Sequence, residues 1–354
     1  MGPKWKNCSK KLRKNAMSAT TKEAVRENKL IDDILELVHS RSNILLSSHV
    51  GPDGDSLGSQ IAFSNYLKSM GKNVWLYNQG HIPHYFHGFK DMDSIVVEPD
   101  KWTVPPQGFD LVIIFECTSL DRIGDVSALV KDNVDIINID HHPENSEYGR
   151  INYLDPGASS AGEMVYRILK RSGYKIDPET ATYLYIAILT DTGRFHFSST
   201  TPECLYAAAD LVDCGVNVKE LTDQIYFNFT EDQLRFTADI VSRMETHLHG
   251  RVCFLTLRDA ELKARGLKYG DMEGLVEWTM RIRKVQVGAL FKDTRPNFSK
   301  ISLRSQGNID VCRLAHKFNG GGHSNAAGCH IEADLETAKK ILLEALEELL
   351  PDDE

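Results

Sequence analysis

The chain has 354 residues, of which 42% are hydrophobic and 26% charged, a composition that excludes disordered, collagen-like and disulfide-stapled proteins. No stretch approaches the ~18 uncharged apolar residues of a membrane span. The formal net charge is −9, and residues 1–30 hold nine Lys or Arg against two Glu, so the rest of the chain is strongly acidic. An acidic body excludes a broad basic face for long nucleic acid but leaves room for a local phosphate site.

Two features of the sequence bear on its compartment. The seven cysteines are scattered without a CxxC pair, which indicates a reducing, cytoplasmic environment. The basic start has no apolar segment of the kind found in secretory signals. We predict that residues 1–28 form a disordered tail, with a nucleic-acid-binding arm as the alternative.

From residue 30 the hydrophobic pattern alternates between helices and strands. Helical spacing predicts helices over residues 30–38 and 56–70. Buried strands are predicted over residues 43–49, 74–78, 111–116 and 135–140. This alternation indicates right-handed crossovers and an α/β fold with a mainly parallel sheet flanked by helices.

The pattern then becomes mostly helical, and a composition change follows near Gly250. Helices are predicted over residues 161–172, 178–189, 202–214 and 232–249. Beyond Gly250 we predict short strands over residues 251–257, 285–291 and 300–305, accompanied by helices over 272–281 and 335–349. The expected organisation is therefore an α/β domain over 29–215, a helical linker over 216–248 and a smaller α+β domain over 249–354.

Acidic and histidine residues gather just after the predicted strands and one helix. They are His49, Asp53, Asp55, Glu116, Asp140, His141, His142 and Asp191. Because the carboxyl ends of parallel strands share one rim of the sheet, we expect these side chains to converge. Uncompensated carboxylates would repel one another, and divalent cations are the usual remedy. Mixed imidazole and carboxylate ligands favour Mn²⁺, Fe²⁺, Co²⁺ or Zn²⁺ over Ca²⁺, and they suffice for two ions about 3.5–4 Å apart.

The motifs carrying these residues resemble a known superfamily. The segments His49-Val-Gly-Pro-Asp53-Gly-Asp55, Asp140-His141-His142-Pro143 and Thr190-Asp191-Thr192-Gly193 resemble the DHH phosphoesterases. Ser302–Ser305 and Gly320–Gly328 resemble the associated DHHA1 domain. Size and motif order are similar to the NrnA-type nanoRNases, which are oligoribonucleases and 3′,5′-bisphosphate nucleotidases. Family II inorganic pyrophosphatases share the DHH chemistry but lack the GGGH domain.

The resemblance implies a role for each of these residues. One metal ion would be held by His49, Asp53 and Glu116, and the other by Asp55, Glu116, His141 and Asp191. Glu116 stands where the family normally has Asp. His142 would contact the substrate phosphate or the leaving oxygen, and Asp140 would accept a hydrogen bond from a ligand imidazole.

The second domain is implied to bind the substrate. Arg304 offers a bidentate fork for phosphate, while Gly320, Gly321 and Gly322 allow close backbone approach and His323 would face the phosphate or base. A flexible loop is the alternative interpretation of the three glycines. Arg281 and Arg283 are further candidates.

The resemblance implies a two-metal enzyme that hydrolyses short oligoribonucleotides to 5′-mononucleotides and pAp to AMP. The expected cofactor is Mn²⁺, with Mg²⁺ or Co²⁺ as substitutes. The alternatives are a phosphodiesterase for cyclic di-AMP or pApA and, if Glu116 is a disabling change, an inactive nucleotide-binding sensor. We expect neither long nucleic acid nor a membrane as partner, and a homodimer is left open.

Overall fold

The computed structural model describes residues 21–83, 86, 88–272 and 274–350. The chain divides into two compact units, Met1–Phe227 and Asn228–Glu354, each built on a six-stranded sheet. Residues 1–20 of the predicted tail lie outside the described residues, whereas residues 21–28 belong to the helix α2 (Thr21–Ser40). Among the described residues, no helix is both long and apolar enough to cross a membrane.

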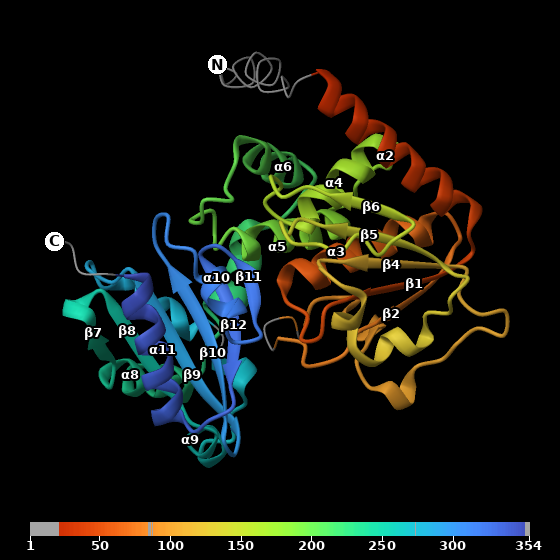
Figure 1. Cartoon of the computed structure of the whole chain (residues 1–354). Coiled ribbons are helices and arrows are strands. Elements are labelled where there is room, and N and C mark those ends of the chain that lie inside the picture. Colours follow the sequence, from red (N-terminus) through yellow and green to blue (C-terminus); the bar gives the residue numbers. More distant parts are fainter. Residues whose placement is uncertain (1–20, 84–85, 87, 273, 351–354) are drawn as a thin grey trace, which may run out of the picture. The chain divides into compact units, whose positions relative to one another are not determined.

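The first unit is built on a parallel sheet with strand order β3-β2-β1-β4-β5-β6 (Figure 1). Every neighbouring pair in it is parallel, which confirms the predicted fold class. The strands are β1 (Asn43–Ser48), β2 (Asn73–Tyr77), β3 (Ile95–Val96), β4 (Leu111–Phe115), β5 (Asp135–Asp140) and β6 (Ile151–Leu154).

Both faces of this sheet are covered, as its continuous apolar strands require. Alternate residues of β1 face opposite sides: Ile44 and Leu46 join the larger core cluster, while Leu45 joins the smaller one. The larger cluster includes residues of the helices α2, α3 (Gly54–Ser69), α4 (Ala161–Ser172), α5 (Pro178–Asp191) and α6 (Pro202–Asp213). The smaller one includes residues of the 3₁₀ segment η4 (Leu120–Leu129). A further helix, α7 (Val218–Tyr226), completes the unit.

Glycines let α5 lie close to both α3 and α4. A Cβ added to Gly58 would lie 2.4 Å from the carbonyl oxygen of Tyr183, and one added to Gly54 would lie 2.3 Å from Thr190 Oγ1. A Cβ on Gly162 of α4 would lie 2.3 Å from the Cβ of Ala187 on α5. Any larger side chain would push these helices apart. The close packing brings the first turn of α3 beside the start of α4 and the end of α5.

The second unit has a mixed sheet with strand order β11-β12-β10-β9-β8-β7 (Figure 1). All neighbouring pairs are antiparallel except β8 and β9, which are parallel. The strands are β7 (Glu245–His247), β8 (Val252–Leu257), β9 (Val287–Arg295), β10 (Phe298–Ser305), β11 (Gly321–His323) and β12 (Ala326–Ile331). The helices are α8 (Glu231–Ser242), α9 (Asp259–Ala264), α10 (Val311–His316) and α11 (Leu335–Leu349). Both α10 and α11 contribute to the main core cluster of this unit.

Several predicted elements differ from the observed ones. The helix predicted over residues 232–249 ends at Ser242, because Glu245–His247 pairs with β8 as an edge strand. The segment predicted as a helix over 272–281 contains the 3₁₀ helix η7 (Leu275–Arg281). The predicted linker over 216–248 contains α7 and α8, and the division between the units falls between them.

Candidate active site

The ends of three neighbouring strands bring the candidate residues together. The strand registers align Ser48 with Phe115, and Phe115 with Ile139. The next residues in each strand, His49, Glu116 and Asp140, therefore start from one edge of the sheet. Glu116 adopts a positive φ of 53°, and its backbone N–H donates to the carbonyl of Ile139 at 2.9 Å. The backbone thus departs from the extended conformation of β4 at Glu116.

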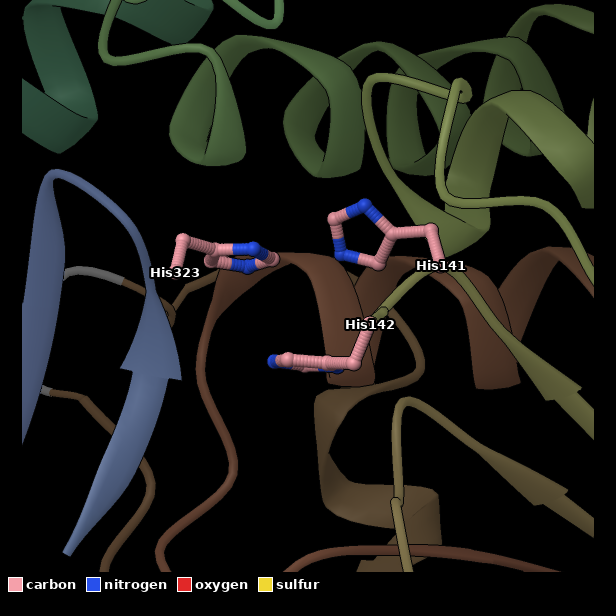
Figure 2. A group of neighbouring side chains, drawn as sticks. All are labelled: His141, His142 and His323. Atoms are coloured by element: carbon pink, nitrogen blue, oxygen red, sulfur yellow. The ribbon is translucent and has the colours of Figure 1, made fainter. Parts of the chain in front are cut away.

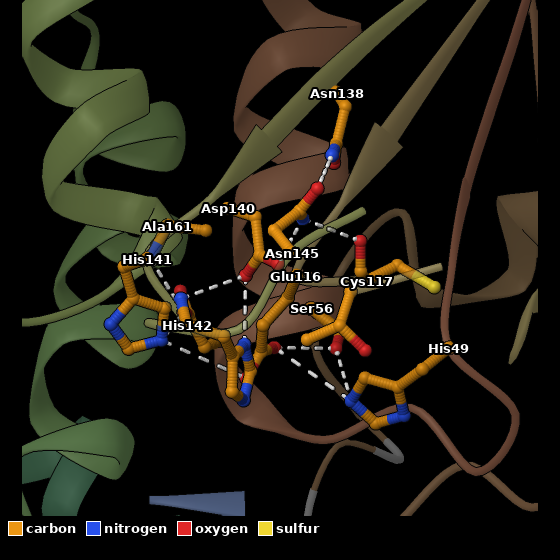
Figure 3. A network of polar contacts seen from close by, with 12 residues as sticks. His49, Ser56, Glu116, Cys117, Asn138, Asp140, His141, His142, Asn145 and Ala161 are labelled. Carbon is orange, nitrogen blue, oxygen red and sulfur yellow. Dashed lines mark hydrogen bonds and ion pairs between the residues drawn. The ribbon is translucent and has the colours of Figure 1, made fainter. Parts of the chain in front are cut away.

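One group of potential ligands consists of His49, Asp53 and Glu116, whose ligand atoms lie within 4.8 Å of one another. Asp53 is the N-cap of α3, where its carboxylate accepts from the backbone N–H of Ser56 at 3.0 Å. The Ser56 hydroxyl donates to Glu116 Oε2 at 2.7 Å and lies 3.1 Å from His49 Nε2 (Figure 3). Ser56 therefore connects an imidazole and a carboxylate of this group.

A second group consists of Asp55, His141 and Asp191, which satisfy the same 4.8 Å criterion. His141 Nε2 lies 3.7 Å from Asp55 Oδ2 and 3.6 Å from Asp191 Oδ2. It also lies 4.0 Å from Glu116 Oε1, while Glu116 Oε2 lies 3.8 Å from His49 Nε2. Glu116 consequently faces both groups, one with each carboxylate oxygen.

Asp55 is held by the first turn of α4. Its carboxylate accepts from the backbone N–H groups of Ala161 at 2.6 Å and Gly162 at 2.8 Å, and from the Ser59 hydroxyl at 3.1 Å. The N-terminus of a helix favours negative charge, so α4 stabilises the carboxylate. Asp55 is only 1% exposed, and its position is therefore tightly defined.

Both candidate ligand imidazoles are oriented by backbone carbonyls. His141 Nδ1 lies 3.2 Å from the carbonyl oxygen of Ala158, and His49 Nδ1 lies 3.1 Å from that of Val50. A carbonyl can only accept, so Nδ1 is the protonated nitrogen in each of these hydrogen bonds. Each ring is thereby held with Nε2 towards the carboxylates, the orientation in which this nitrogen could bind a metal ion.

The electrostatics of the two groups fit divalent cations. Burial, followed by the charge of Asp191, raises the pKa of Asp55 to about 8. Burial and the charges of Asp53, Asp55 and Asp191 raise the pKa of Glu116 well above its usual range. Burial also acts to raise the pKa of Asp53, but His49 and the N–H of Ser56 outweigh it and lower that pKa. A cation between the carboxylates would remove the repulsion that raises the first two pKa values.

His142 is held by hydrogen bonds to Asp140, which Asn145 also contacts (Figure 3). Its Nδ1 lies 2.7 Å from Asp140 Oδ1, and its backbone N–H donates to the same oxygen at 3.1 Å. Asn145 Nδ2 donates to Asp140 Oδ2 at 2.7 Å and to the carbonyl of Cys117 at 3.1 Å. Asp140 is fully buried, and its pKa is lowered because His142 and Asn145 outweigh the effect of burial.

The partner of Asp140 differs from the sequence-based expectation. Asp140 was expected to accept from a ligand imidazole, but it accepts from His142, whereas His141 is oriented by Ala158. Figure 2 shows the two imidazoles extending from the segment that follows β5, with ring centroids 5.2 Å apart. Asp140 therefore fixes the ring that is expected to meet the substrate rather than one expected to hold metal.

The second unit carries the residues predicted to bind substrate. A Cβ on Gly320 would lie 2.1 Å from the carbonyl oxygen of Gly328, and one on Gly322 would lie 2.5 Å from that of Ala326. Close pairing with β12 therefore accounts for glycine at these two positions without any ligand. Gly322 is the one of the three with a positive φ, at 138°, and Gly321 and Gly322 lie in β11 rather than in a loop.

The remaining predicted residues of this unit lie on its strands and on η7. His323 ends β11, and Arg304 lies near the end of β10, opposite Ala326 of β12. Arg281 ends η7, where its guanidinium stacks 4.2 Å from the ring centroid of Trp278. Arg283 is exposed just beyond it.

Sequence reasoning missed the residues that support the candidate ligands. Ser56 and Asn145 are polar residues of common types, and Ala158, Ala161 and Gly162 act through their backbones. The spacing of Ser56 within the first turn after Asp53 is a capping signal that could have placed its N–H on Asp53, but no pattern reveals its hydroxyl contact with Glu116.

Comparison with known proteins gives consistent results for both units. Residues 43–188 match the family described as DHH family, N-terminal domain, and residues 250–351 match the DHHA1 domain. The chain is 31% identical over 324 residues to a Thermus thermophilus protein named bifunctional oligoribonuclease and PAP phosphatase NrnA, covering 91% of this chain and 94% of that protein. A Bacillus subtilis protein of the same name is 26% identical over 320 residues, covering 87% and 98% respectively. An exopolyphosphatase-related protein from Bacteroides fragilis has a similar structure, with a TM-score of 0.82 and 28% identity over 90% of this chain and 96% of that one.

The fold and the grouped imidazoles and carboxylates are those of a metal-dependent phosphoesterase. The chain belongs to the DHH family and combines its N-terminal domain with a DHHA1 domain. The predicted resemblance and the predicted enzyme class are confirmed.

Proposed function

We propose that the protein is a two-metal phosphoesterase that hydrolyses short oligoribonucleotides to 5′-mononucleotides and pAp to AMP. The observation that carries this proposal is the pair of ligand groups at the carboxyl ends of β1, β4 and β5, with Glu116 facing both. The relatives named as oligoribonucleases and PAP phosphatases, which match most of this chain, support the substrate class.

The residues present suit two divalent cations, with Mn²⁺ as the expected ion. His49, Asp53 and Glu116 would hold one, and Asp55, His141, Asp191 and Glu116 the other. When bound, two such ions activate water near neutral pH and neutralise charge on the phosphoryl oxygens. Imidazole and carboxylate ligands without thiolates favour Mn²⁺ or Co²⁺, and Mg²⁺ would substitute through the carboxylates.

The chain's own residues supply orientation and proton transfer. Asp140 orients the His142 ring through Nδ1, and His142 would contact the substrate phosphate or deliver a proton to the leaving ribose oxygen. In the second unit, the Arg304 guanidinium, the backbone N–H groups of Gly320–Gly322 and His323 would bind the terminal phosphate, and Arg281 stacked on Trp278 offers a further cation. The formal net charge of −9 supports a short substrate, because an acidic chain offers no broad basic face for long nucleic acid.

The six cysteines that the structure describes are all free thiols. This state supports the proposed cytoplasmic location, because disulfides are rare in reducing compartments.

The test is hydrolysis in Mn²⁺ of pAp, pApA, cyclic di-AMP and RNA from two to about twenty-four nucleotides. We expect turnover of pAp and of the shortest RNAs, with rates falling as RNA length increases. Faster turnover of pApA or cyclic di-AMP would assign the protein to the alternative phosphodiesterase activity. Binding of these nucleotides without any turnover would show a sensor and refute the proposal.

A further inference from the structure

The segment between β6 and α4, residues 155–162, contacts two of the candidate metal ligands through its backbone. The carbonyl of Ala158 orients the imidazole of His141 at 3.2 Å. The N–H groups of Ala161 and Gly162 hold the carboxylate of Asp55 at 2.6 and 2.8 Å. We call residues 155–162 the cradle segment. The position of its backbone determines how Asp55 and His141 are oriented.

The cradle segment is itself held by the buried side chain of Glu163, which is 1% exposed. Glu163 Oε2 accepts from the backbone N–H of Ser159 at 2.9 Å and from its hydroxyl at 2.7 Å. Ser159 lies directly after Ala158. A carboxylate that accepts two hydrogen bonds from one residue fixes the position of that residue closely.

Arg167, one helical turn along α4, completes the arrangement. Its guanidinium pairs with Glu163, with Asp155 at the start of the cradle segment, and with Glu27 of α2 at 3.0 Å. The backbone N–H of Asp155 donates to the carbonyl of Asp140 at the end of β5, at 3.1 Å. The Arg167 side chain therefore links Asp155, at the start of the cradle segment, with Glu163, which directly follows its end.

We propose that Glu163, supported by Arg167, is a positioning residue that sets the affinity of the metal ion held by Asp55, His141 and Asp191. Glu163 makes no contact with the reacting atoms and acts through Ser159 and the cradle segment. The inference rests on the proposed metal site. It concerns that ion, because the backbone of the cradle segment contacts two of its ligands, His141 and Asp55.

The decisive variant is Glu163→Gln, which keeps the shape of the side chain and removes its charge. Losing a partner that orients metal ligands commonly lowers metal affinity about 10–100-fold. In titrations of the metal-free protein with Mn²⁺, we expect the wild type to bind two ions and the variant to bind one of them about 10–100-fold more weakly. Because the effect acts through occupancy, excess Mn²⁺ should restore kcat for pAp.

A matched control is Asp32→Asn. Asp32 pairs with Arg171 and so links α2 to α4, as Glu27 and Arg167 do, but it contacts no residue of the cradle segment. We expect this variant to bind both ions as the wild type does. Ser159→Ala removes the hydroxyl contacts with Glu163 and Cys204 but keeps the backbone hydrogen bond to Glu163, and it provides the measurement if Glu163→Gln does not fold.

The outcomes are distinct. A wild type that binds fewer than two ions refutes the proposed metal site and, with it, this inference. Suppose instead that the wild type binds two ions and that Glu163→Gln, or Ser159→Ala in its place, binds both with the same affinities. Then the proposed metal site stands and this inference is wrong. Equal weakening of both ions, or activity that excess Mn²⁺ fails to restore, would indicate a general structural role and likewise overturn it.

Discussion

Replacing Asp55 with asparagine is expected to have opposite effects on the metal-free and the metal-loaded protein. In the absence of metal, burial and the charge of Asp191 raise the pKa of Asp55 from 3.8 to about 8. At pH 7 the folded protein therefore retains a proton that the unfolded chain has lost. Folding must include this protonation, and the stability of the metal-free protein falls as the pH rises from about 4 to about 8.

The size of the effect follows from the pKa difference. At pH 7 the proton costs about 4 kcal/mol, because the pH lies roughly three units above the unfolded pKa and each unit corresponds to about 1.4 kcal/mol. Asparagine avoids this cost, but its amide NH₂ leaves the N–H of Ala161 or Gly162 without an acceptor, which costs about 1–3 kcal/mol. The net expectation is that metal-free Asp55→Asn is about 1–3 kcal/mol more stable than the wild type at pH 7.

The assay is equilibrium unfolding by urea or heat, in EDTA and in saturating Mn²⁺, from pH 5 to 8. With Mn²⁺ the order reverses, because the wild type gains binding free energy that the variant has lost. Asp53→Asn is the matched control, since the pKa of Asp53 is lowered rather than raised. Asparagine still caps a helix, so this control should leave the metal-free protein equally stable or less stable.

Two results would refute the reasoning. If Asp55→Asn is no more stable than the wild type in EDTA at pH 7, burial does not raise the pKa of Asp55 as described. If the two variants shift stability in the same direction at every pH, the opposite electrostatic environments assigned to Asp53 and Asp55 are wrong.

Four further changes test other parts of the site. Metal affinity should rise with pH through the range near 8, because Asp55 and Glu116, whose pKa values are both raised, must lose their protons to bind a cation, and the release of protons on Mn²⁺ binding, measured by calorimetry in two buffers, checks this. Glu116→Asp should remain active without being faster, because a shorter side chain on a backbone placed for glutamate can misplace the ligand by about 1 Å and cost ~100-fold in rate; a gain in kcat would mean that Glu116 is a disabling residue. Arg304→Ala should raise KM for pAp by roughly one to two decades, the equivalent of about 1.5–3 kcal/mol, while Mn²⁺ affinity stays constant; an unchanged KM would place phosphate binding elsewhere. Gly162→Ala should lower stability by about 1–3 kcal/mol in thermal unfolding, since the new Cβ would lie 2.3 Å from that of Ala187, and wild-type stability would contradict the close approach of α4 to α5.

The parallel sheet was predictable because its strands are short, apolar and separated by helical patterns. The candidate ligands were predictable for a related reason: His49, Glu116 and His141 immediately follow strands, and parallel strands end at one edge. Sequence spacing is sufficient to group such residues without any knowledge of their contacts.

The strands of the second unit were harder to predict. β12 is composed largely of small residues, and β7 has only three, so neither shows a strong hydrophobic alternation. Their strand conformation arises from pairing with β10 and β8. Such pairing joins residues distant in the sequence, and a local pattern does not contain it. The cradle segment escaped prediction because its contacts with His141 and Asp55 come from the backbone.

Because the strongest donors to Asp55 are peptide N–H groups, no ordinary side-chain substitution at Ala161 or Gly162 can delete them. Only proline removes a backbone N–H, and any other replacement acts by displacing the helix. Most substitutions at Ala161 and Gly162 therefore keep the two N–H donors of the Asp55 carboxylate. They can disturb these hydrogen bonds only by moving the backbone of α4. In a mutational scan, the loss of activity at these two positions should follow the volume of the new side chain rather than its polarity. The residue types at these positions therefore do not reveal that their N–H groups hold Asp55.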